Sequence, residues 1–545
     1  MHRRTTLIVG LVSNLWLFMG LAPTSQALDV KPHVPKVGDQ KCPSNKALGQ
    51  CTCKSRSSGL YIACRDTTEE AILGVLDSIK EINRDSPTPP SRSSGLYIAC
   101  RDTTEEAILG VLDSIKEINR DSPTPPEIYS LFVMNTTFPR LPMHYFMGLS
   151  VIHFTLTQSN LSAISAGALD SLDRTLSQLS FANNELHICP KFPRLSQLKL
   201  LNLNHNKLTR IPSNHFEHLP ALTQLLLYEN RIAHISGKAF EGLSRNLYKL
   251  NLGVNNLTAV PTEALRPLQA LHTLQISDNK IDQLHQDDFP EELGSGLDQL
   301  DLHRNLLTKL PANSFSNLKR LTSLHLNENQ ISSLEDDAFA GLEHLQWLYL
   351  NHNPIKGVPT RSLRPLTSLR SLDLRNCEIN NLSADSFEVF SKNLQYLHLQ
   401  YNHIKTLPMG VFDFMESLDH LQLYSNRIEH APYDVFSGVL DTMEVLDLHG
   451  NPLVCDCDLR WYREWLDNFH ATDDAGFLVD KATCHVPKYE ADQYVHKVPH
   501  EDFGCKTSRS GSWTSAAKGL SSISDIALPT TSLLLVNLAK KIFHS

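Results

Sequence analysis

The sequence predicts an α/β solenoid: a curved horseshoe of stacked coils with a parallel β-sheet on its concave face. A motif of the form L-x-x-L-x-L-x-x-N-x-L begins about fourteen times within residues 128–453, at spacings of 22 to 26 residues. Phe or Leu returns eighteen residues into almost every repeat, and cysteines flank the run at each end. Because one coil cannot bury its own leucine face, neighbouring coils must stack on one another.

The first 27 residues of the 545-residue chain read as a signal peptide, followed by a linker at 28–41. Basic residues precede the apolar run LIVGLVSNLWLFMGLA, and Ser25 and Ala27 are the small residues of a cleavage site. An uncleaved anchor is the alternative. Secretion would place the 11 cysteines where disulfides persist. Four glycosylation sequons fit that route, and they begin at Asn135, Asn160, Asn256 and Asn381.

Each repeat opens with a short strand. The x-L-x-L-x core alternates with period two, so its leucines point into the coil and its x residues point outward. Stacked coils then bring parallel strands about 4.8 Å apart. The repeats begin at Ile128, Val151, Leu176, Leu198, Leu222, Leu247, Leu271, Leu297, Leu321, Leu345, Leu369, Leu394, Leu418 and Met443.

Two further columns belong to the core. An Asn eight residues into each repeat must pair its buried amide with the backbone of adjacent coils. It is Asn206, Asn230, Asn255, Asn279, Asn305, Asn329, Asn353, Asn402, Asn426 and Asn451, and Cys377 takes this slot as a small buried thiol. The apolar column packs under the convex side. It is Phe146, Phe216, Phe240, Phe289, Phe315, Phe339, Phe387, Phe412 and Phe436, with Leu169, Leu265 and Leu363 substituting. The repeat at Leu176 skips this slot, and its CPKFP makes a shorter loop.

Over residues 42–505 this pattern resembles extracellular leucine-rich repeat proteins of the 24-residue type. Residues 454–505 resemble their C-terminal cap, which implies the disulfides Cys455–Cys484 and Cys457–Cys505. Trp461 and Trp465 recur at helical spacing and are expected to cover the last coil. Zinc bound by the four cysteines is the rival interpretation.

Residues 42–127 resemble the N-terminal cap of the same family. By that resemblance the expected disulfides are Cys42–Cys53 and Cys51–Cys64. The details are similar to arthropod secreted members, which include the non-catalytic subunit of a shrimp luciferase. Three cysteines then remain unassigned: Cys100, Cys189 and Cys377. The last two lie eight repeats apart, or about 38 Å of stacked strands, so they cannot form a disulfide with each other.

This N-terminal cap contains a perfect tandem duplication: residues 55–90 recur without change as 91–126. The first copy supplies Cys64 and a helix whose start carries a capping box, Thr67 and Glu70. The second is not a 24-residue coil, and its SPTPP is not expected to stack in the sheet.

One copy is therefore expected to loop out of the stack. Either Cys64 closes the cap and residues 91–126 loop out, or Cys100 closes it and residues 55–90 do. The ten residues between Cys53 and Cys64 favour the first arrangement. The second copy is the one joined to Ile128, so its helix would instead dock on the first coil. Perfect identity favours a recent duplication or a gene-model error over a functional tandem unit.

The informative surface is the concave face of the later repeats. Four residues into each, the outward column reads Asp301, His325, Tyr349, Asp373, His398, Gln422 and Asp447; two residues further on it reads His303, Asn327, Asn351, Arg375, Gln400, Tyr424 and His449. Polar, aromatic and titratable groups on a rigid surface suit macromolecular recognition. The alternative is that they are solvated strand residues with no partner.

Two pairs on that face predict pH dependence. Asp301 beside His325, and Asp373 beside His398, would each favour a charged histidine, so ligand binding is expected to change between about pH 5.5 and 7.5. A metal at such pairs is the lesser alternative, and no metal site is predicted. As partner-binding residues we single out Asp301, His303, His325, Tyr349, Asp373, Arg375, His398, Tyr424 and His449.

The chain shows no motif of a hydrolase, a metalloprotease or a nucleotide-binding protein, so the prediction is a non-enzymatic protein without a cofactor. A net charge of −9, without long runs of one sign, argues against nucleic-acid binding. We expect a binding or adhesion protein with an extracellular protein or glycan ligand. The alternative is a non-catalytic, stabilising subunit of a secreted enzyme complex. In the tail, residues 506–545, a short apolar segment outlines either a lipid-anchor signal or a disordered secreted end.

Overall fold

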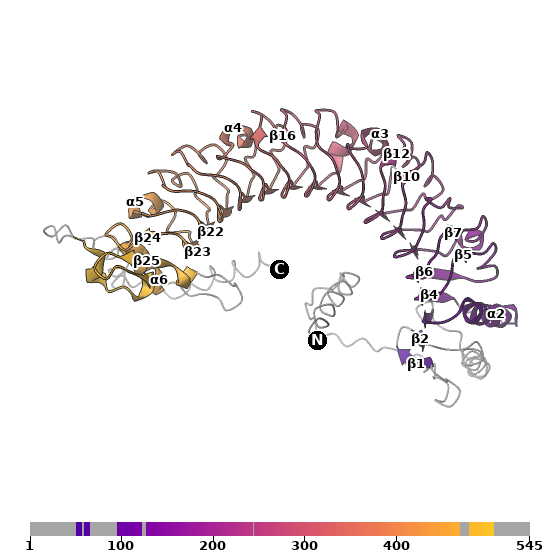
Figure 1. Cartoon of the computed structure of the whole chain (residues 1–545). Coiled ribbons are helices and arrows are strands. Elements are labelled where there is room, and N and C mark those ends of the chain that lie inside the picture. The colour runs from indigo at the N-terminus through magenta and orange to yellow at the C-terminus, as the bar shows by residue number, and fades with distance from the viewer. Residues whose placement is uncertain are drawn as a thin grey trace, which may run out of the picture.

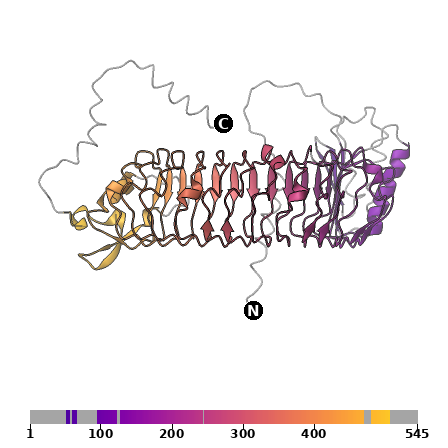
Figure 2. The same ribbon diagram turned by 90° about the horizontal axis from the view of Figure 1, so that it is seen from above.

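The chain folds into the predicted solenoid. The computed structural model describes residues 51–56, 59–65, 95–121, 127–243, 245–468 and 479–505. The coils stack along an arc whose inner edge carries the strands, with the N-terminal strands at one end and the C-terminal cap at the other (Figure 1). Seen from above, the coils stand side by side in chain order (Figure 2). The predicted signal peptide, the predicted linker, Cys42 and residues 506–545 lie outside the described residues.

The concave sheet contains 17 strands within the described part of the chain. Each of the fourteen predicted repeat starts supplies one of them, and three more come from the N-terminal cap. All neighbouring pairs are parallel except β1 with β2, and neighbouring leucines share a register, as Leu324 does with Leu300 and Leu348. The strands are β1 (Cys51–Arg56), β2 (Gly59–Arg65), β3 (Gly95–Arg101), β4 (Ile128–Met134), β6 (Val151–Thr157), β8 (Gln178–Ser180), β9 (Leu200–Asn202), β11 (Gln224–Leu226), β13 (Lys249–Asn251), β14 (Thr273–Gln275), β15 (Gln299–Asp301), β17 (Ser323–His325), β19 (Trp347–Tyr349), β20 (Ser371–Asp373), β21 (Tyr396–His398), β22 (His420–Gln422) and β23 (Val445–Asp447).

The predicted asparagine column, here called the asparagine ladder, ties each coil to the one before it. The Asn329 Oδ1 accepts a hydrogen bond from the Leu307 N–H at 3.2 Å, and its Nδ2 donates to the Leu302 and Leu326 carbonyls at 3.1 and 3.0 Å. The same pattern recurs at every predicted Asn and also at Asn184. Cys377 is buried in its slot, and burial raises the pKa of its thiol to about 12, as expected of an inert side chain.

The residue before each ladder position has a left-handed backbone. Thirteen non-glycine residues in this slot have φ between 49° and 58°, and Gly450 completes the set at 66°. This conformation bends the chain off the strand and so brings the ladder amide over the preceding coil. Val254 holds it with a β-branched side chain, which is the least favourable type for this region.

The predicted apolar column forms a continuous stack, here called the phenylalanine spine. All its members are buried, and neighbouring rings along it lie 5.6 to 6.4 Å apart. Phe192, within CPKFP, fills the slot that the repeat at Leu176 was expected to skip, and its ring stacks on Phe216. Parallel strands need only about 4.8 Å each. The convex side of each coil is therefore wider than its concave side, which bends the stack toward the sheet (Figure 1).

Small elements cover the outer parts of the coils. They are the paired strands β5 (Arg140–Leu141) and β7 (Ala163–Ile164), β10 (Arg210–Ile211) and β12 (His234–Ile235), and β16 (Lys309–Leu310) and β18 (Ser333–Leu334), with helices η2 (Asp170–Leu172), α3 (Thr262–Leu265), η3 (Glu291–Ser295), α4 (Thr360–Leu363) and α5 (Tyr433–Phe436). None of the helices in the described part of the chain combines the length and the apolarity that a membrane span requires.

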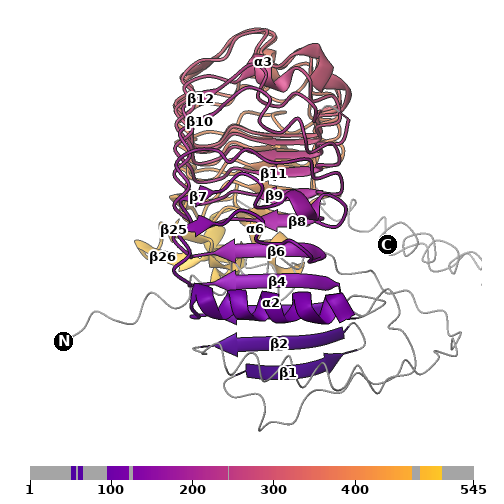
Figure 3. The ribbon, with the colours of Figure 1, turned by 90° about the vertical axis from the view of Figure 1, so that its right-hand side faces the viewer.

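The expectation that one copy of the duplication loops out is wrong. Strands β2 and β3 are the same sequence in the two copies, and they pair in parallel at matching positions, so that Cys64 faces Cys100. Strand β3 then pairs with β4, and Figure 3 shows β2, β4 and β6 at successive levels of the sheet. Both copies therefore contribute a strand to the stack. The reason is that stacking requires only matched strands, while extra length can be carried on the convex side.

The second copy carries its extra length as helix α2 (Glu105–Asp121), on the convex side of the arc (Figure 1). Ile108, Leu112 and Ile115 are fully buried against the first coils, so the helix docks as expected. Its N-cap is Thr104, whose Oγ1 accepts from the Ala107 N–H at 3.3 Å. The capping box expected at Thr67 and Glu70 lies outside the described residues; the matching Thr103 is not the cap.

Deletion of residues 91–126 should leave a folded protein. The shortened chain keeps one whole copy, and β2 would then pair with β4 as β3 now does, because the two strands are identical. Cys100 is a buried free thiol, so the denatured, unreduced protein should lose one titratable thiol. Circular dichroism and a thiol count on the two proteins check this. An unfolded product, or an unchanged count, would contradict the assignment of each copy as an independent stacking unit.

The C-terminal cap consists of β24 (Leu453–Val454), α6 (Arg460–Asn468), η4 (Val479–Lys481), β25 (Thr483–Val486), β26 (Ala491–Tyr494), η5 (Val495–Lys497) and η6 (His500–Phe503). It contains the disulfides Cys455–Cys484 and Cys457–Cys505, with Cα atoms 5.2 and 4.8 Å apart. These are the pairs that the resemblance implies, so the four cysteines are not available as zinc ligands.

Aromatic residues of α6 close the last coil. The Trp461 Nε1 donates to the Ala431 carbonyl at 2.7 Å, and its ring contacts Phe436. Tyr462 is the most deeply buried of them, with its hydroxyl donating to the Leu446 carbonyl. Trp465 stacks on Tyr462, and both tryptophans are partly buried against the core, so Tyr462 joins the two tryptophans in the cover.

The N-terminal disulfides remain a proposal. Cys51 lies opposite Cys64 in the antiparallel pairing of β1 with β2, a register that suits the expected bond. The side chains of Cys51, Cys53 and Cys64 lie outside the described residues.

Candidate functional site

The predicted outward columns lie side by side on the concave face. Strand register places one row in order across seven neighbouring strands: Asp301, His325, Tyr349, Asp373, His398, Gln422 and Asp447. At the same slot the six strands from β6 to β14 carry no charged residue; they carry Thr155, Ser180, Asn202, Leu226, Asn251 and Gln275. Titratable groups of this row are thus confined to the C-terminal half of the sheet, from β15 to β23.

The aspartates of this row have a structural task. Asp301 and Asp373 each accept the backbone N–H two residues later through Oδ1, as Asp447 does from His449. Asn202 and Asn251 do the same earlier in the sheet. A side-chain oxygen at this slot therefore satisfies the N–H where the strand ends, whatever else it does.

A central charged group surrounds His303. Its Nδ1 is 2.5 Å from Asp301 Oδ1 and its Nε2 is 3.3 Å from Asp278 Oδ2. Arg304 adds an ion pair to Glu328, with Nε 2.6 Å from Oε2. The hydrogen bond to Asp301 is the main cause that raises the pKa of His303, and the two carboxylate charges add to it. His303 is therefore held toward its charged form.

The expected effect of Asp301 on His325 is wrong, although the two residues are neighbours in register. Burial lowers the pKa of His325, more than the charge of Asp301 raises it, because the ring lies flat on Tyr349 at 4.4 Å. The Asp301 carboxylate instead contacts His303, which follows two residues later where the same strand ends. His398 Nδ1 donates to Gln422 Oε1, 2.9 Å away. Asp373 lies beside His398 in register, as predicted, and forms its ion pair with Arg375 at 3.3 Å.

Replacement of His303 by Gln should change how stability depends on pH. Its folded-state pKa is raised, so its contribution is fully present below its unfolded pKa and disappears as pH rises through the folded value. The wild type should therefore exceed H303Q in melting temperature by more at pH 6 than at pH 8.5. The effect of pH on the contribution of His325 has the opposite sign, because its folded-state pKa is lowered and the protein therefore loses stability as the pH falls. H325Q is the control, and an equal H303Q deficit at both pH values would refute the assignment.

A second, aromatic group lies toward the C-terminal end of the face. Tyr424 stacks on His449 at 4.5 Å and meets Tyr401 edge-on at 5.2 Å. His449 Nδ1 is 2.6 Å from Asp447 Oδ1. Beside them Gln400 Nε2 donates to Gln422 Oε1 at 2.9 Å, the same oxygen that His398 contacts. The result is a connected, preorganised surface.

The structure separates the predicted binding residues by exposure. Asp373 is buried, as is Asp447 of the same column, so both support their neighbours rather than meet a partner, whereas Asp301 and His398 are half-buried. His303, His325, Tyr349, Tyr424 and His449 are half-buried, and Arg375 is exposed. Sequence reasoning missed a third outward column, two residues into each repeat, which adds Trp347, Tyr396 and His420. The period-two alternation could have found it. Tyr401, in the left-handed slot, was missed because that conformation is not visible in the pattern.

The face offers a surface rather than a deep pocket. A shallow polar hollow of about 330 Å³ opens where the strands begin, lined by Asp298, Arg320, Thr322, His344, Gln346 and Ser368. Within the described ranges, one group of His, Cys, Asp and Glu side chains is close enough to share a metal ion, and it lies off this face at His430, Asp456 and Asp458. The geometry thus favours a large ligand over a small one.

Comparison with known families decides the class. A family model described as "Leucine rich repeat" matches residues 174–232, 196–245, 245–291, 295–355, 367–428 and 392–453. Residues 174–291, 295–355 and 367–453 are thus leucine-rich repeats, and the fold is a leucine-rich repeat solenoid. The matched segments coincide with the coils of the solenoid described above.

Solved structures of other leucine-rich repeat proteins share the fold of this chain. The protein in a crystal structure of a TLR13–ssRNA13 complex has a TM-score of 0.59 and 23% identity, covering 77% of this chain and 61% of that one. Toll, in a Drosophila Toll–Spatzle complex, gives 0.52 and 17%, covering 84% and 76%. A leucine-rich repeat protein of Leptospira interrogans gives 0.50 and 21%, covering 72% and 91%. At these identities the likeness concerns the fold alone.

A human protein, leucine-rich repeat-containing protein 3C, is 47% identical over 47 residues. The match covers 9% of this chain and 17% of that protein, so the chain spans less than a fifth of its length. It supports the family and carries no activity over. Leucine-rich repeat proteins typically bind other macromolecules rather than catalyse reactions.

Proposed function

We propose that this protein is a non-enzymatic extracellular binding protein that recognises a protein or glycan on the C-terminal half of its concave face. The observation that carries the proposal is the connected surface from β15 to β23. It combines an exposed arginine, stacked aromatic rings and a hydrogen-bonded glutamine network, whereas the matching row of the earlier strands from β6 to β14 is uncharged. Aromatic and arginine side chains supply most of the binding energy at protein interfaces.

Secretion and glycosylation belong to the same proposal. Asn135, Asn160 and Asn381 are exposed and Asn256 is half-buried. Asn160 and Asn256 occupy the same slot, just after the ladder residue, and Asn381 lies beyond it. All these sites are therefore away from the outward columns of β15 to β23, and glycans there would leave the proposed binding surface accessible. An adhesion or matrix role fits such a surface.

A triple alanine variant at Tyr349, His398 and Tyr424 tests the proposal in a pull-down from native extracellular fluid. Loss of these side chains should weaken capture of the specific partner by at least about 30-fold, the effect of a binding hot spot. The matched control replaces Gln224 on β11, Tyr228 just after it and Tyr248 just before β13, and it should bind as the wild type does. Equal binding by all three proteins would count against the C-terminal half as the site.

The identity of the captured partner separates two roles. A receptor or matrix protein supports the binding and adhesion role. An enzyme recovered in a one-to-one ratio supports the second interpretation, a stabilising subunit of a secreted enzyme complex, for which the similarity to arthropod secreted members is the basis.

A further inference from the structure

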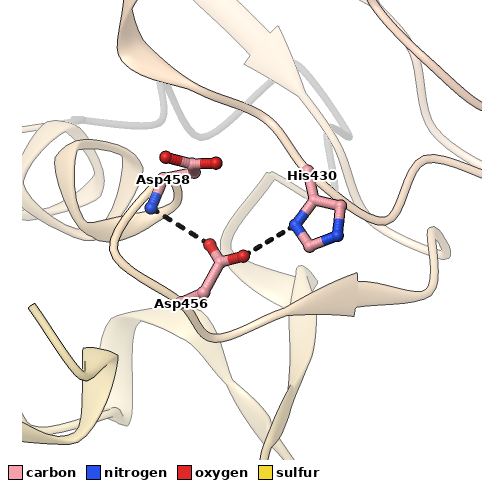
Figure 4. Close-up of side chains that lie close together, drawn as sticks. All are labelled: His430, Asp456 and Asp458. Atoms are coloured by element: carbon pink, nitrogen blue, oxygen red, sulfur yellow. Dashed lines mark hydrogen bonds and ion pairs between the residues drawn. The ribbon is translucent and has the colours of Figure 1, made fainter.

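A separate group of titratable side chains lies where the last coils meet the C-terminal cap. His430 follows β22 on the outer part of its coil, and Asp456 and Asp458 lie in the cap segment between β24 and α6 (Figure 4). His430 Nδ1 is 2.6 Å from Asp456 Oδ2. One potential ligand atom from each of the three residues lies within 4.8 Å of the others. Two different parts of the fold thus converge on one point.

The cap holds both carboxylates in place. Asp456 lies between Cys455 and Cys457, and each of those cysteines is fixed by a disulfide to a distant part of the cap. The Asp458 N–H donates to Asp456 Oδ1 at 3.0 Å, which leaves Asp456 Oδ2 directed at the histidine (Figure 4). The backbone that carries the three side chains would therefore need little reordering to accept a ligand.

The charge of the group is not balanced by a basic side chain. In the described part of the chain, neither Asp456 nor Asp458 forms an ion pair with a lysine or arginine. Two adjacent carboxylates repel each other, and a bound cation would relieve that repulsion. One imidazole nitrogen with two carboxylate oxygens is a donor set that suits Zn²⁺, with water as a fourth ligand.

We propose that His430, Asp456 and Asp458 bind a divalent transition-metal ion, typified by Zn²⁺, that fastens the C-terminal cap to the solenoid. Ligand atoms around a tetrahedral Zn²⁺ lie roughly 3.4 Å apart, given bonds of about 2.0–2.2 Å. An ion would therefore replace the direct contact of His430 with Asp456, at 2.6 Å, by a wider spacing, and would draw in the Asp458 carboxylate, which lies within 4.8 Å of both. The sequence predicts no metal site, and this one depends on a contact between residues 26 positions apart that the repeat pattern does not reveal.

The competing explanation is a plain histidine–carboxylate pair without a metal. The cap supplies an internal comparison for it: His485 Nδ1 is 3.2 Å from Asp492 Oδ1, both side chains are exposed, and among the described residues no third ligand joins them. A variant at His485 therefore removes a similar pair from the same cap and serves as the matched control.

Calorimetric titration of the full chain with ZnCl₂ at pH 7.5, after treatment with a chelator, tests the site. The wild type should bind one Zn²⁺ equivalent with micromolar affinity, and Zn²⁺ should raise its melting temperature. D458N removes a ligand but keeps the His430–Asp456 contact, so it should weaken that equivalent at least tenfold, as should H430A. H485A should bind as the wild type does.

Other histidines on this chain will bind Zn²⁺ weakly. The decisive measurement is therefore the single Zn²⁺ equivalent that the wild type binds and that D458N and H430A bind more weakly. Unchanged binding in both variants, or equal loss in H485A, would overturn the proposal. Binding of Ca²⁺ in preference to Zn²⁺ would also overturn it, because Ca²⁺ selects oxygen ligands and would leave the imidazole without a role.

Discussion

Asn329→Ala should destabilise the protein by about 2 kcal/mol or more, because it leaves the buried Leu307 N–H without its acceptor and removes one donor from each of two buried carbonyls. The Leu307 N–H loses its acceptor, while the carbonyls of Leu302 and Leu326 lose one donor each and keep the amides of Asn305 and Asn353. Each unsatisfied buried group costs about 1–3 kcal/mol. The loss should be local, since each coil contacts mainly its neighbours. Hydrogen exchange should therefore quicken in the coils around residue 329 before the ends of the solenoid respond.

The matched control is Asn327→Ala, two residues earlier in the same coil. Asn327 faces outward on the concave side, and its side chain makes no hydrogen bond with any described residue. Its replacement should change the urea midpoint little. Equal urea midpoints for the two variants would contradict the claim that the Asn329 side-chain amide stabilises the fold.

The repeat frame was predictable because many coils repeat one set of constraints. A leucine position that is ambiguous in one repeat is fixed by thirteen others, so the strands, the ladder and the spine follow from the averaged pattern. The C-terminal disulfides follow from a cap whose cysteine spacing resembles that of a known family. These features depend on position within the coil and not on any single neighbour.

The duplicated segment was mispredicted because its length was compared with a whole coil. Only the strand has to match for a coil to join the sheet, and the seven residues of β3 match β2 identically. The remaining residues of the second copy include helix α2 on the convex side, where the stack is already wider. A length criterion therefore rejects an insertion that the fold accepts.

The histidine contacts were not predictable from columns alone. Register correctly places Asp301 beside His325, but the backbone bends just beyond Asp301 and returns His303 to its carboxylate. The ring of Tyr349 then covers His325. Whether Asp301 contacts His303 or His325 depends on side-chain rotation and burial, and a strand pattern reveals neither. The site near His430 was missed for the same reason.

Phe315→Ala should cost about 3–5 kcal/mol, the usual range for removing a fully buried phenylalanine. Its ring is 0% exposed and stacks between Phe289 and Phe339, with centroids 5.8 and 6.1 Å away. Phe414→Ala is the matched control: that ring is 44% exposed, so its loss should cost under about 1 kcal/mol. Denaturant unfolding of the two variants measures the difference.

Phe315→Leu separates volume from stacking, because leucine already fills this slot in the coils of Leu169, Leu265 and Leu363. If the spine acts by filling space, the leucine variant should lose about 1 kcal/mol and keep most of the stability. A loss as large as that of the alanine variant would mean that ring-on-ring contact is required. Because the spacing of the rings exceeds that of the strands, the alanine variant should also relax the curvature next to β17. X-ray scattering of the full chain would detect that change, and with it the link between the convex core and the geometry of the concave surface.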